Sequence, residues 1–596
     1  MTTTNALPEW DLKSEYPSNT SAEFVADLAL IEASQLKIAK AVDQFRADLQ
    51  KNPVEQKSLI QNLQSIAEIE DEAFTVFHNL RNFVSCECSV DASNQVAQKK
   101  LFELEAFGSK LNQTVTAVSL YLARASDEVI TAYLDHPITN ARGFSLRLSR
   151  LNQATLLPES EENLVSALAL SGPRAWGNLY NDISGRLKCD VALGSGTEMM
   201  GLAKASGLMK GSDEPTRKAA WDGINGAWSE HKESAAAILN SLAGWRIEIA
   251  NRRSHTKKID FLTMPLRQSM IERDTLEAML SAVRDHRPTA QKALRNMAKG
   301  MGKARLDPWD MLAAAPEPKN KPNQTGRSFE EGFEMIRESF LRVDPEFGAF
   351  CDIMRSKNWI EARVLPNKRN GAFCTGFAKS RTPRVFQTYL GSLNDIRTLA
   401  HELGHAYHSW VQRDLPRYHR DSPMTLAESA SVFAETAFAD YMLSTGDATA
   451  KAEINWQNDE TAAAFLLNIP VRYEFEKSFY TKRMKSTLTA DELSETMTEA
   501  WMNWYGDTVS AADPMFWASK LHFSISSVSF YNFPYTFGYL FSRGLYARRK
   551  SEGPSFMKAY VNILRDTGRM TAEELIQNHL GEDIRKVDYW KRALEV

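Results

Sequence analysis

The sequence has few cysteines, no excess of positive charge and no long apolar run, and each absence excludes a class of protein. Five cysteines in 596 residues are an odd number, so they do not fit a disulfide framework. We expect reduced thiols at every one: Cys86, Cys88, Cys189, Cys351 and Cys374. A net charge of −4 gives no electrostatic reason to expect nucleic acid or an anionic membrane as a partner.

Signals for a membrane or for export are also missing. No stretch approaches the roughly 18 apolar residues of a membrane-spanning helix. The segment from Met1 to Leu12 contains neither a basic region nor an apolar core of a signal peptide. We therefore expect a cytoplasmic protein with no membrane partner. With 596 residues, the chain is too long for one small core and predicts two or more lobes.

The strongest signal is a His-Glu-x-x-His motif at residues 401–405. Its surroundings have a helical apolar period, and no proline occurs between residues 384 and 415. Residues four apart share one helix face, so His401 and His405 can bind one zinc ion, with Glu402 beside it as general base. Gly404 is unfavourable inside a helix, which predicts that another segment packs closely against it.

The third zinc ligand is predicted to come from the next segment. Ser422 and Pro423 resemble an N-cap and a first helical position, and Glu428 follows among small residues. We take Glu428 as the ligand, and Glu435, two turns further on, as a hydrogen-bond partner of a ligand histidine. Asp414, His419 and Asp421 are competing ligands in the intervening loop.

His408 lies one turn beyond the two histidines, and we expect it to be packed rather than bound to the metal. Metzincins would have glycine at position 408 and histidine at 411, where this chain has His408 and Val411, so that class is excluded.

Most of the remaining chain has a helical pattern. An apolar stripe marks a first helix at Phe24, Leu28, Ile31, Leu36 with Ile38, Val42, Phe45 and Leu49. Pro53 opens a second helix and Asp91 to Asn94 starts a third. Further helices are predicted at 143–186, at 214–252, at 271–300 and, after the helix that carries Glu428, to about residue 510, with Pro470 as an interruption. Residues 187–193 suit a short strand or a link, and residues 313–326 a proline-rich surface linker.

Two other stretches bear on the chemistry. Short β-type runs at 360–365, 371–377 and 383–389 predict a small sheet whose edge strand could align a substrate backbone. Near the C-terminus, Tyr531, Tyr535 and Tyr539 recur every four residues, which predicts phenols on one helix face. A phenol or a histidine could stabilise the oxyanion of a tetrahedral intermediate.

Several of these segments together resemble the oligoendopeptidase F branch of the thimet-oligopeptidase family of zinc metallopeptidases. The resemblance rests on residues 398–408, 426–431, 371–374 and 530–539, and on Trp10-Asp11-Leu12 near the start. It implies a mostly α-helical, two-lobed ellipsoid that encloses a deep substrate channel, with a small β-sheet next to the zinc-binding helix. We assign residues 1–200 to an N-terminal helical domain covering the channel and residues 201–596 to the catalytic domain.

The resemblance also implies the site residues and the activity. His401, His405 and Glu428 would hold one zinc ion per chain, and Glu402 would be the base for attack of a zinc-bound water on internal bonds of short peptides. Tyr531, Tyr535, Tyr539 and His522 are the candidates for oxyanion stabilisation. The chain lacks the Gly-Gly-Tyr loop of the animal oligopeptidases, so which of the four acts stays open. We expect a monomer or a small homo-oligomer.

Two alternatives remain. The same zinc centre could serve a dipeptidyl-carboxypeptidase-type exopeptidase, which needs a basic residue for the C-terminal carboxylate of its substrate. In a non-catalytic zinc-containing peptide-binding protein, a fourth ligand such as His408 or His419 would close the metal shell and Glu402 would be idle.

Overall fold

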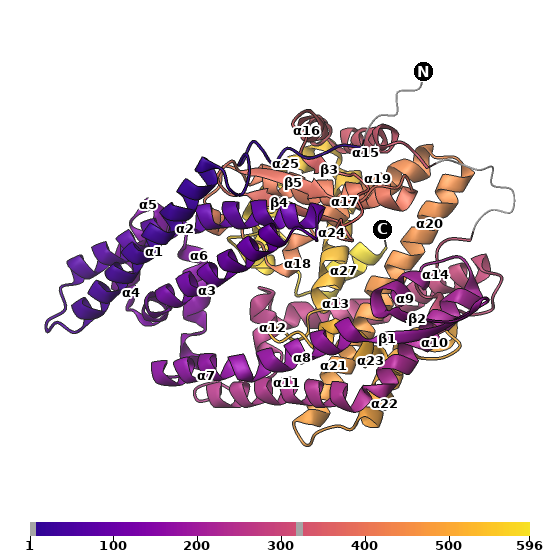
Figure 1. Ribbon diagram of the computed structural model, residues 1–596, viewed down its shortest axis with the longest axis horizontal. Coiled ribbons are helices and arrows are strands. Elements are labelled where there is room, and N and C mark those ends of the chain that lie inside the picture. Colours follow the sequence, from indigo (N-terminus) through magenta and orange to yellow (C-terminus); the bar gives the residue numbers. More distant parts are fainter. Residues whose placement is uncertain (1–6, 317–325, 596) are drawn as a thin grey trace. The chain divides into compact units, whose positions relative to one another are not determined.

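The computed structural model describes residues 7–316 and 326–595, and it is mostly helical with two small sheets (Figure 1). Contacts divide the chain into two compact units. Unit 1 consists of residues 1–154, 325–441 and 545–581, and unit 2 consists of residues 155–324, 442–544 and 582–596. The predicted mostly helical, two-lobed fold is confirmed. The division at residue 200 and the enclosed channel stay predictions.

Two further properties concern the whole described chain. Within residues 7–316 and 326–595, no helix is long and apolar enough to cross a membrane. All five cysteines lie in the described residues and are unpaired, as predicted.

Unit 1 begins with three long helices that pack side by side (Figure 1): α1 (Ala22–Leu49), α2 (Gln56–Val90) and α3 (Gln95–Arg124). The predicted stripe of α1 is buried at Phe24, Ile31, Ile38, Val42 and Phe45. Leu36 and Leu49 were wrongly included in it, because both are exposed. Ile38 is seven residues after Ile31 and returns to the same face, whereas Leu36 points away and is exposed.

Shorter helices follow in this unit. They are α4 (Asp127–Leu134), α5 (Pro137–Asn140) and α6 (Gly143–Leu151).

The predicted small sheet also lies in unit 1. Its strands are β3 (Ile360–Glu361), β4 (Phe373–Phe377) and β5 (Thr382–Phe386), in the order β3-β5-β4. β5 pairs parallel with β3 and antiparallel with β4, so β4 is an edge strand. Helix α17 (Leu393–Val411) packs against β4 and β5, which places the motif histidines next to the sheet as predicted.

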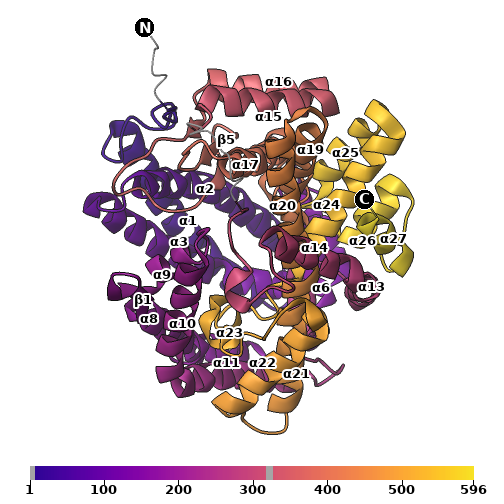
Figure 2. The same ribbon diagram turned by 90° about the vertical axis from the view of Figure 1, so that its right-hand side faces the viewer.

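Aromatic side chains cover another face of α17. The ring of Tyr407 lies 4.5 Å from that of Phe347 and 5.5 Å from that of Phe350, measured between centroids. Both phenylalanines belong to α16 (Pro345–Ser356), which packs against α15 (Phe329–Val343) near α17 (Figure 2). Two later helices complete this region, α25 (Phe556–Asp566) and α26 (Ala572–Leu580). Helix α17 is therefore held on several sides by elements of its own unit.

Unit 2 is built from helices and one hairpin. Strand β1 (Lys188–Leu193), predicted as a strand or a link, pairs antiparallel with β2 (Gly196–Gly201). The first group of helices is α7 (Glu159–Ser171), α8 (Pro173–Arg186), α9 (Leu202–Leu208), α10 (Glu214–Glu230), α11 (Lys232–Arg253), α12 (Thr263–Gln268), α13 (Arg273–Asp285) and α14 (Arg287–Gly300). The predicted helices 214–252 and 271–300 are thus each two helices. Of the predicted linker, residues 317–325 lie outside the described residues.

The second group of helices in unit 2 corrects one expectation. Pro470 does not end the helical run. Helix α20 (Ala448–Ala463) continues through a π-helical turn at Ala464–Asn468 into α21 (Ile469–Arg483). The wider turn accommodates the proline, which lies in the first turn of α21. The remaining helices are α22 (Ala490–Tyr505), α23 (Phe516–Ser519) and α27 (Val587–Leu594). Helix α24 (Phe533–Glu552) starts in unit 2, and its residues from 545 onward belong to unit 1.

Candidate metal centre

The helix that carries the motif begins with a reciprocal cap. The Ser392 hydroxyl accepts a hydrogen bond from the backbone N–H of Asp395 at 3.0 Å, and the Asp395 carboxylate accepts one from the N–H of Ser392 at 3.1 Å. This capping box fixes where α17 starts, and the absence of proline lets it run on to Val411.

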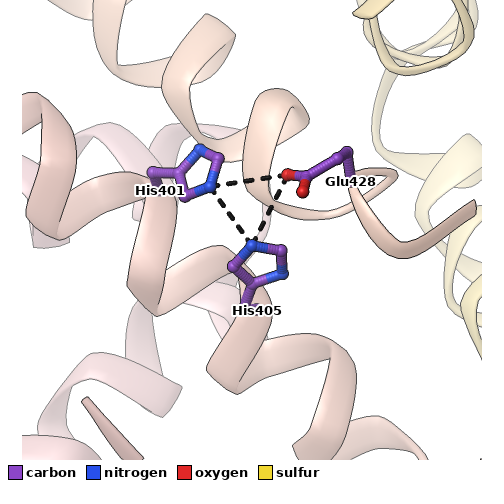
Figure 3. A group of neighbouring side chains, drawn as sticks. All are labelled: His401, His405 and Glu428. Atoms are coloured by element: carbon purple, nitrogen blue, oxygen red, sulfur yellow. Dashed lines mark hydrogen bonds and ion pairs between the residues drawn. The ribbon is translucent and has the colours of Figure 1, made fainter. Parts of the chain in front are cut away.

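Three side chains bring their donor atoms together on this helix and the segment after it (Figure 3). Nε2 of His401 lies 3.2 Å from Nε2 of His405. The Oε2 atom of Glu428 lies 3.4 Å from the first nitrogen and 3.5 Å from the second. Each of the three side chains is about a quarter exposed, so a metal ion can reach them.

The size of this triangle fits a tetrahedral zinc ion. Bonds of about 2.0–2.1 Å to nitrogen and oxygen place tetrahedral ligands about 3.3 Å apart. All three edges of the triangle lie close to that separation. Two imidazoles and one carboxylate leave a fourth position open, as catalytic zinc sites do.

Glu428 reaches the site from a break between two helices, and here the sequence prediction was wrong. Instead of one helix capped by Ser422, the structure has a short α18 (Met424–Ala427) with Pro423 at its N-cap, and then α19 (Ser431–Thr445). Glu428 caps the end of α18, and its Oε2 also accepts a hydrogen bond from the Ser431 hydroxyl at 2.6 Å.

The break allows backbone to lie directly against α17. A Cβ atom on Gly404 would come within 2.6 Å of the Ala430 carbonyl oxygen and 2.7 Å of the Ser431 Cα. The predicted close packing at Gly404 is therefore confirmed. Only glycine lets the backbone just after Glu428 approach this near to the histidines.

Glu435 orients the first histidine, as predicted. Its Oε1 lies 2.5 Å from Nδ1 of His401, and its Oε2 accepts a hydrogen bond from Nε of Arg397 at 2.9 Å. Burial opposes ionisation of Glu435, but Arg397 and His401 hold its pKa down to about 2. A carboxylate at Nδ1 makes that nitrogen the donor and leaves the Nε2 lone pair directed at the triangle.

Glu402 has the environment of a proton acceptor. It is 6% exposed, and its Oε2 has no hydrogen-bond partner in the described residues. Burial raises the pKa of Glu402 to about 7; the charge of His401 opposes this rise, and the charges of Glu428 and Glu435 add to it. A carboxyl that titrates near neutral pH can both accept and return a proton.

The competing ligands have other roles. His408 is buried, and its Nε2 lies 3.0 Å from the Leu564 carbonyl and 2.9 Å from the Thr567 hydroxyl, in keeping with a packed histidine. Asp414 forms an ion pair with Arg565 at 2.6 Å. Neither of them, nor His419 or Asp421, belongs to the group of potential metal ligands in the described chain.

The candidates for oxyanion stabilisation near the C-terminus form a cluster within unit 2. The phenol oxygens of Tyr531 and Tyr535 lie 3.4 Å apart, and the His522 ring centroid is 5.2 Å from that of Tyr531. Nη1 of Arg472 donates a hydrogen bond to Nδ1 of His522 at 2.7 Å. Burial, followed by the charge of Arg472, lowers the pKa of His522 to about 4, so this ring is neutral at pH 7.

The predicted face of three tyrosines was only partly right. Tyr535 and Tyr539 lie one turn apart in α24, whereas Tyr531 precedes that helix, because the chain turns at Phe530 with φ +52°. The Tyr539 ring packs against Phe465, 5.0 Å away between centroids.

Comparison with known proteins identifies the family. Residues 207–596 match the family described as Peptidase family M3, and residues 122–188 match Oligopeptidase F. The chain belongs to peptidase family M3. The resemblance drawn from the motifs is thereby confirmed, and membership of M3 supports peptidase activity, with peptides as substrates.

Relatives and solved structures agree with this assignment to M3. The chain is 21% identical to an Oligoendopeptidase F homolog of Lactococcus lactis over 98% of its own length and 95% of that protein. It is similar in fold to a Chlamydophila abortus protein classed as a peptidase (TM-score 0.78, 19% identity, 98% and 97% of the two chains). Oligoendopeptidase-F of Enterococcus faecium has the same fold (TM-score 0.66, 16% identity, 95% and 96%).

Two arginines of this M3 chain were missed in the sequence. Arg397 had a usable signal, since it lies four residues before His401 and so on the same face of α17. Arg472 had none, because its partner His522 lies 50 positions further along the chain.

A second group of carboxylates could be mistaken for a metal site. Glu214, Asp307 and Asp310 in unit 2 lie close together, but the Lys303 ammonium is paired with all three, at 2.9 Å from Asp307 and 2.6 Å from Asp310. The Lys303 ammonium takes the place of a cation among the three carboxylates, and Arg217 also pairs with Asp310 at 2.8 Å.

Proposed function

We propose that the protein is a zinc-dependent endopeptidase that hydrolyses internal bonds of short peptides. The observation that carries the proposal is the triangle of donor atoms on His401, His405 and Glu428, with the buried, unpartnered Oε2 of Glu402 beside it. The three donors would hold one zinc ion per chain. When bound there, zinc polarises the scissile carbonyl and lowers the pKa of a coordinated water to about 7.

Glu402 moves the proton in this mechanism. With a pKa of about 7, it is substantially ionised at neutral pH, and its free Oε2 accepts a proton from the attacking water. The protonated carboxyl then donates that proton to the amide nitrogen as the C–N bond breaks. Glu435 keeps His401 in the tautomer that offers Nε2 to the metal.

The phenols and the neutral imidazole of unit 2 are the proposed donors to the oxyanion. Because Arg472 donates to Nδ1 of His522, Nε2 of that ring carries the hydrogen and can donate. The paired phenols of Tyr531 and Tyr535 offer further donors, and Tyr539 remains a fourth candidate. Hydrogen-bond donors of this kind stabilise the charge that develops on the carbonyl oxygen.

Edge strand β4 is the proposed docking site for the peptide backbone. It lies against α17, and its Cys374 is close enough to Glu402 that this charge, after burial, raises the pKa of the thiol. An extended peptide added to β4 would run alongside the catalytic helix, in the manner of β-augmentation.

Hydrolysis of an internally quenched peptide of about eight residues, blocked at both ends, tests the proposal. We expect cleavage at an internal bond that stops when a chelator removes the metal. Glu402→Gln should lower kcat by roughly 10²- to 10⁴-fold while one zinc per chain stays bound, since glutamine cannot accept the proton. No cleavage by zinc-loaded protein, but removal of dipeptides from free C-termini, would point to the exopeptidase instead. No cleavage of either substrate would point to a peptide-binding protein.

A further inference from the structure

Unit 2 contains a cavity of about 260 Å³ to which the proposed mechanism assigns no ligand. Its walls are mostly apolar, with aromatic rings contributed by Trp221, Trp501 and Phe516. Two cations, Arg472 and Lys520, also line it. An apolar cavity with a few charged groups at one place is the usual form of a binding site for a small organic ligand.

The two cations lie against the same aromatic ring. The Lys520 ammonium is 4.8 Å from the centroid of the Phe516 ring, and the Arg472 guanidinium carbon is 5.2 Å from it. Burial lowers the pKa of Arg472 to about 10, and burial followed by the charge of Arg472 lowers the pKa of Lys520. Two like charges therefore lie at one aromatic ring in a partly desolvated place, which is unfavourable without an anion.

The protein itself supplies no such anion at contact distance. Neither Arg472 nor Lys520 forms an ion pair with a carboxylate in the described residues. Arg472 directs Nε to the Asn468 carbonyl oxygen and Nη1 to His522 and the Asn532 carbonyl oxygen, all neutral partners. Its Nη2 and the Lys520 ammonium have no hydrogen bond to any described side chain or backbone group.

Two carboxylates also line the cavity, Glu460 and Asp513. Asp513 accepts a hydrogen bond from Nε1 of Trp221 at 3.2 Å, its Oδ1 is buried without a partner, and burial raises its pKa. It attracts Lys520 without pairing with it. The free donors of the two cations therefore remain available to a ligand.

We propose that this cavity binds the C-terminal carboxylate of a short peptide together with an apolar last side chain. In the proposed complex the carboxylate accepts hydrogen bonds from Nη2 of Arg472 and from the Lys520 ammonium, two donor groups that no described residue uses. The aromatic and aliphatic walls then cover the side chain. The inference extends the proposed peptidase function, on which it rests, by naming a feature of the substrate: a free C-terminus preceded by an apolar residue.

Calorimetric titration with N-acetyl-glycyl-phenylalanine and with its C-terminal amide tests this directly. We expect the acid to bind wild-type protein at least tenfold more tightly than the amide, because only the acid carries a negative charge that can pair with the two cations. Lys520→Met should weaken binding of the acid by roughly ten- to a hundredfold, the loss of one charge-assisted hydrogen bond, and leave the amide unchanged. Arg472→Gln should also weaken binding of the acid, but it removes the hydrogen bond to His522 as well, so Lys520→Met is the decisive variant.

Matched variants separate loss of charge from loss of fold. Lys520 has no hydrogen bond to lose, and Lys520→Arg keeps the cation and should keep most of the affinity for the acid. Lys477→Met removes an exposed lysine from α21, outside the cavity lining, and should bind as wild type does. Equal affinity of wild type for acid and amide, or an unchanged affinity in Lys520→Met, would overturn the proposal.

Three further measurements identify which ligand is bound and at which site. The titration is repeated after removal of zinc: binding that persists supports the cavity, and binding that disappears places the carboxylate on the metal and overturns the proposal. 3-Phenylpropionate, an acid without a peptide bond, should bind more weakly than the acetylated dipeptide. Equal affinity for the two acids would overturn the proposal that the cavity binds a peptide. Hydrolysis of the doubly blocked peptide, measured on the same preparations, tests the peptidase function independently, since that substrate has no carboxylate to place here.

Discussion

The contact at Gly404 gives the sharpest prediction, because one added methyl group should disturb the candidate metal site without touching it. In Gly404→Ala, the new Cβ would lie 2.6 Å from the Ala430 carbonyl oxygen and 2.9 Å from its carbon. Ordinary contact begins at about 3.4 Å, so the backbone of residues 430–431 must move away by most of an ångström. These are backbone atoms, which cannot turn aside as the end of a side chain can.

The expected magnitude follows from two opposing effects. Overpacking a well-filled interior costs about 1–3 kcal/mol, and alanine regains about 1 kcal/mol over glycine inside a helix. The variant should therefore lose up to about 2 kcal/mol of unfolding free energy. Glu428 lies two residues from the displaced carbonyl, and metal–ligand distances hold within about 0.2 Å, so zinc affinity should fall at least roughly tenfold.

Competition with a chromophoric chelator measures the zinc dissociation constant, and calorimetry of the metal-free protein measures the change in Tm. Gly226→Ala is the matched control. Gly226 also lies inside a helix, α10, but a Cβ there would meet no atom within 4 Å. The control should keep the zinc affinity of wild type and gain a little stability, since only the helix propensity changes.

One result would refute the reasoning. If Gly404→Ala bound zinc as tightly as wild type and melted at the same temperature or above, like Gly226→Ala, the approach of Ala430 to α17 could not be what positions Glu428. A lower Tm with unchanged zinc affinity would separate the two effects and show that Glu428 adjusts independently of the backbone that follows it.

Two further variants test groups around and away from the metal. Glu435→Ala should weaken zinc binding roughly 10- to 100-fold, because His401 loses the carboxylate that fixes its tautomer; an unchanged affinity in the chelator assay would contradict that role. Glu476 in unit 2 is buried, with one oxygen on the Phe530 N–H at 2.8 Å and the other unpartnered, and burial raises its pKa from 4.5 to about 7. Between these values the folded state binds more protons than the unfolded state, so stability falls as pH rises through this window. The Tm of Glu476→Gln relative to wild type should therefore increase from pH 5 to pH 8, and a constant difference would count against this explanation.

The parts of the site that follow helical spacing could be predicted from the sequence. His401 and His405 are four residues apart in an uninterrupted helix, so their convergence needed no knowledge of the fold. Glu435 was also found, because a carboxylate beside a ligand histidine is a common requirement of metal sites. Contacts between distant segments could not be found in this way. The bond from Arg472 to His522 and the packing of Ala430 on Gly404 depend on how helices pack, which a single sequence does not encode locally.

The error at Glu428 shows how packing can override a local signal. Ser422 and Pro423 predict one continuous helix, and local propensity alone favours it. The chain instead ends α18 at Ala427 and starts α19 at Ser431, and the intervening backbone fills the space that Gly404 leaves on α17. In this arrangement the third donor of the candidate site, Glu428, is positioned by contact between backbone atoms. The His-Glu-x-x-His motif therefore specifies two donors of the site, whereas the third depends on a glycine inside the motif, at a position that the motif itself leaves unrestricted.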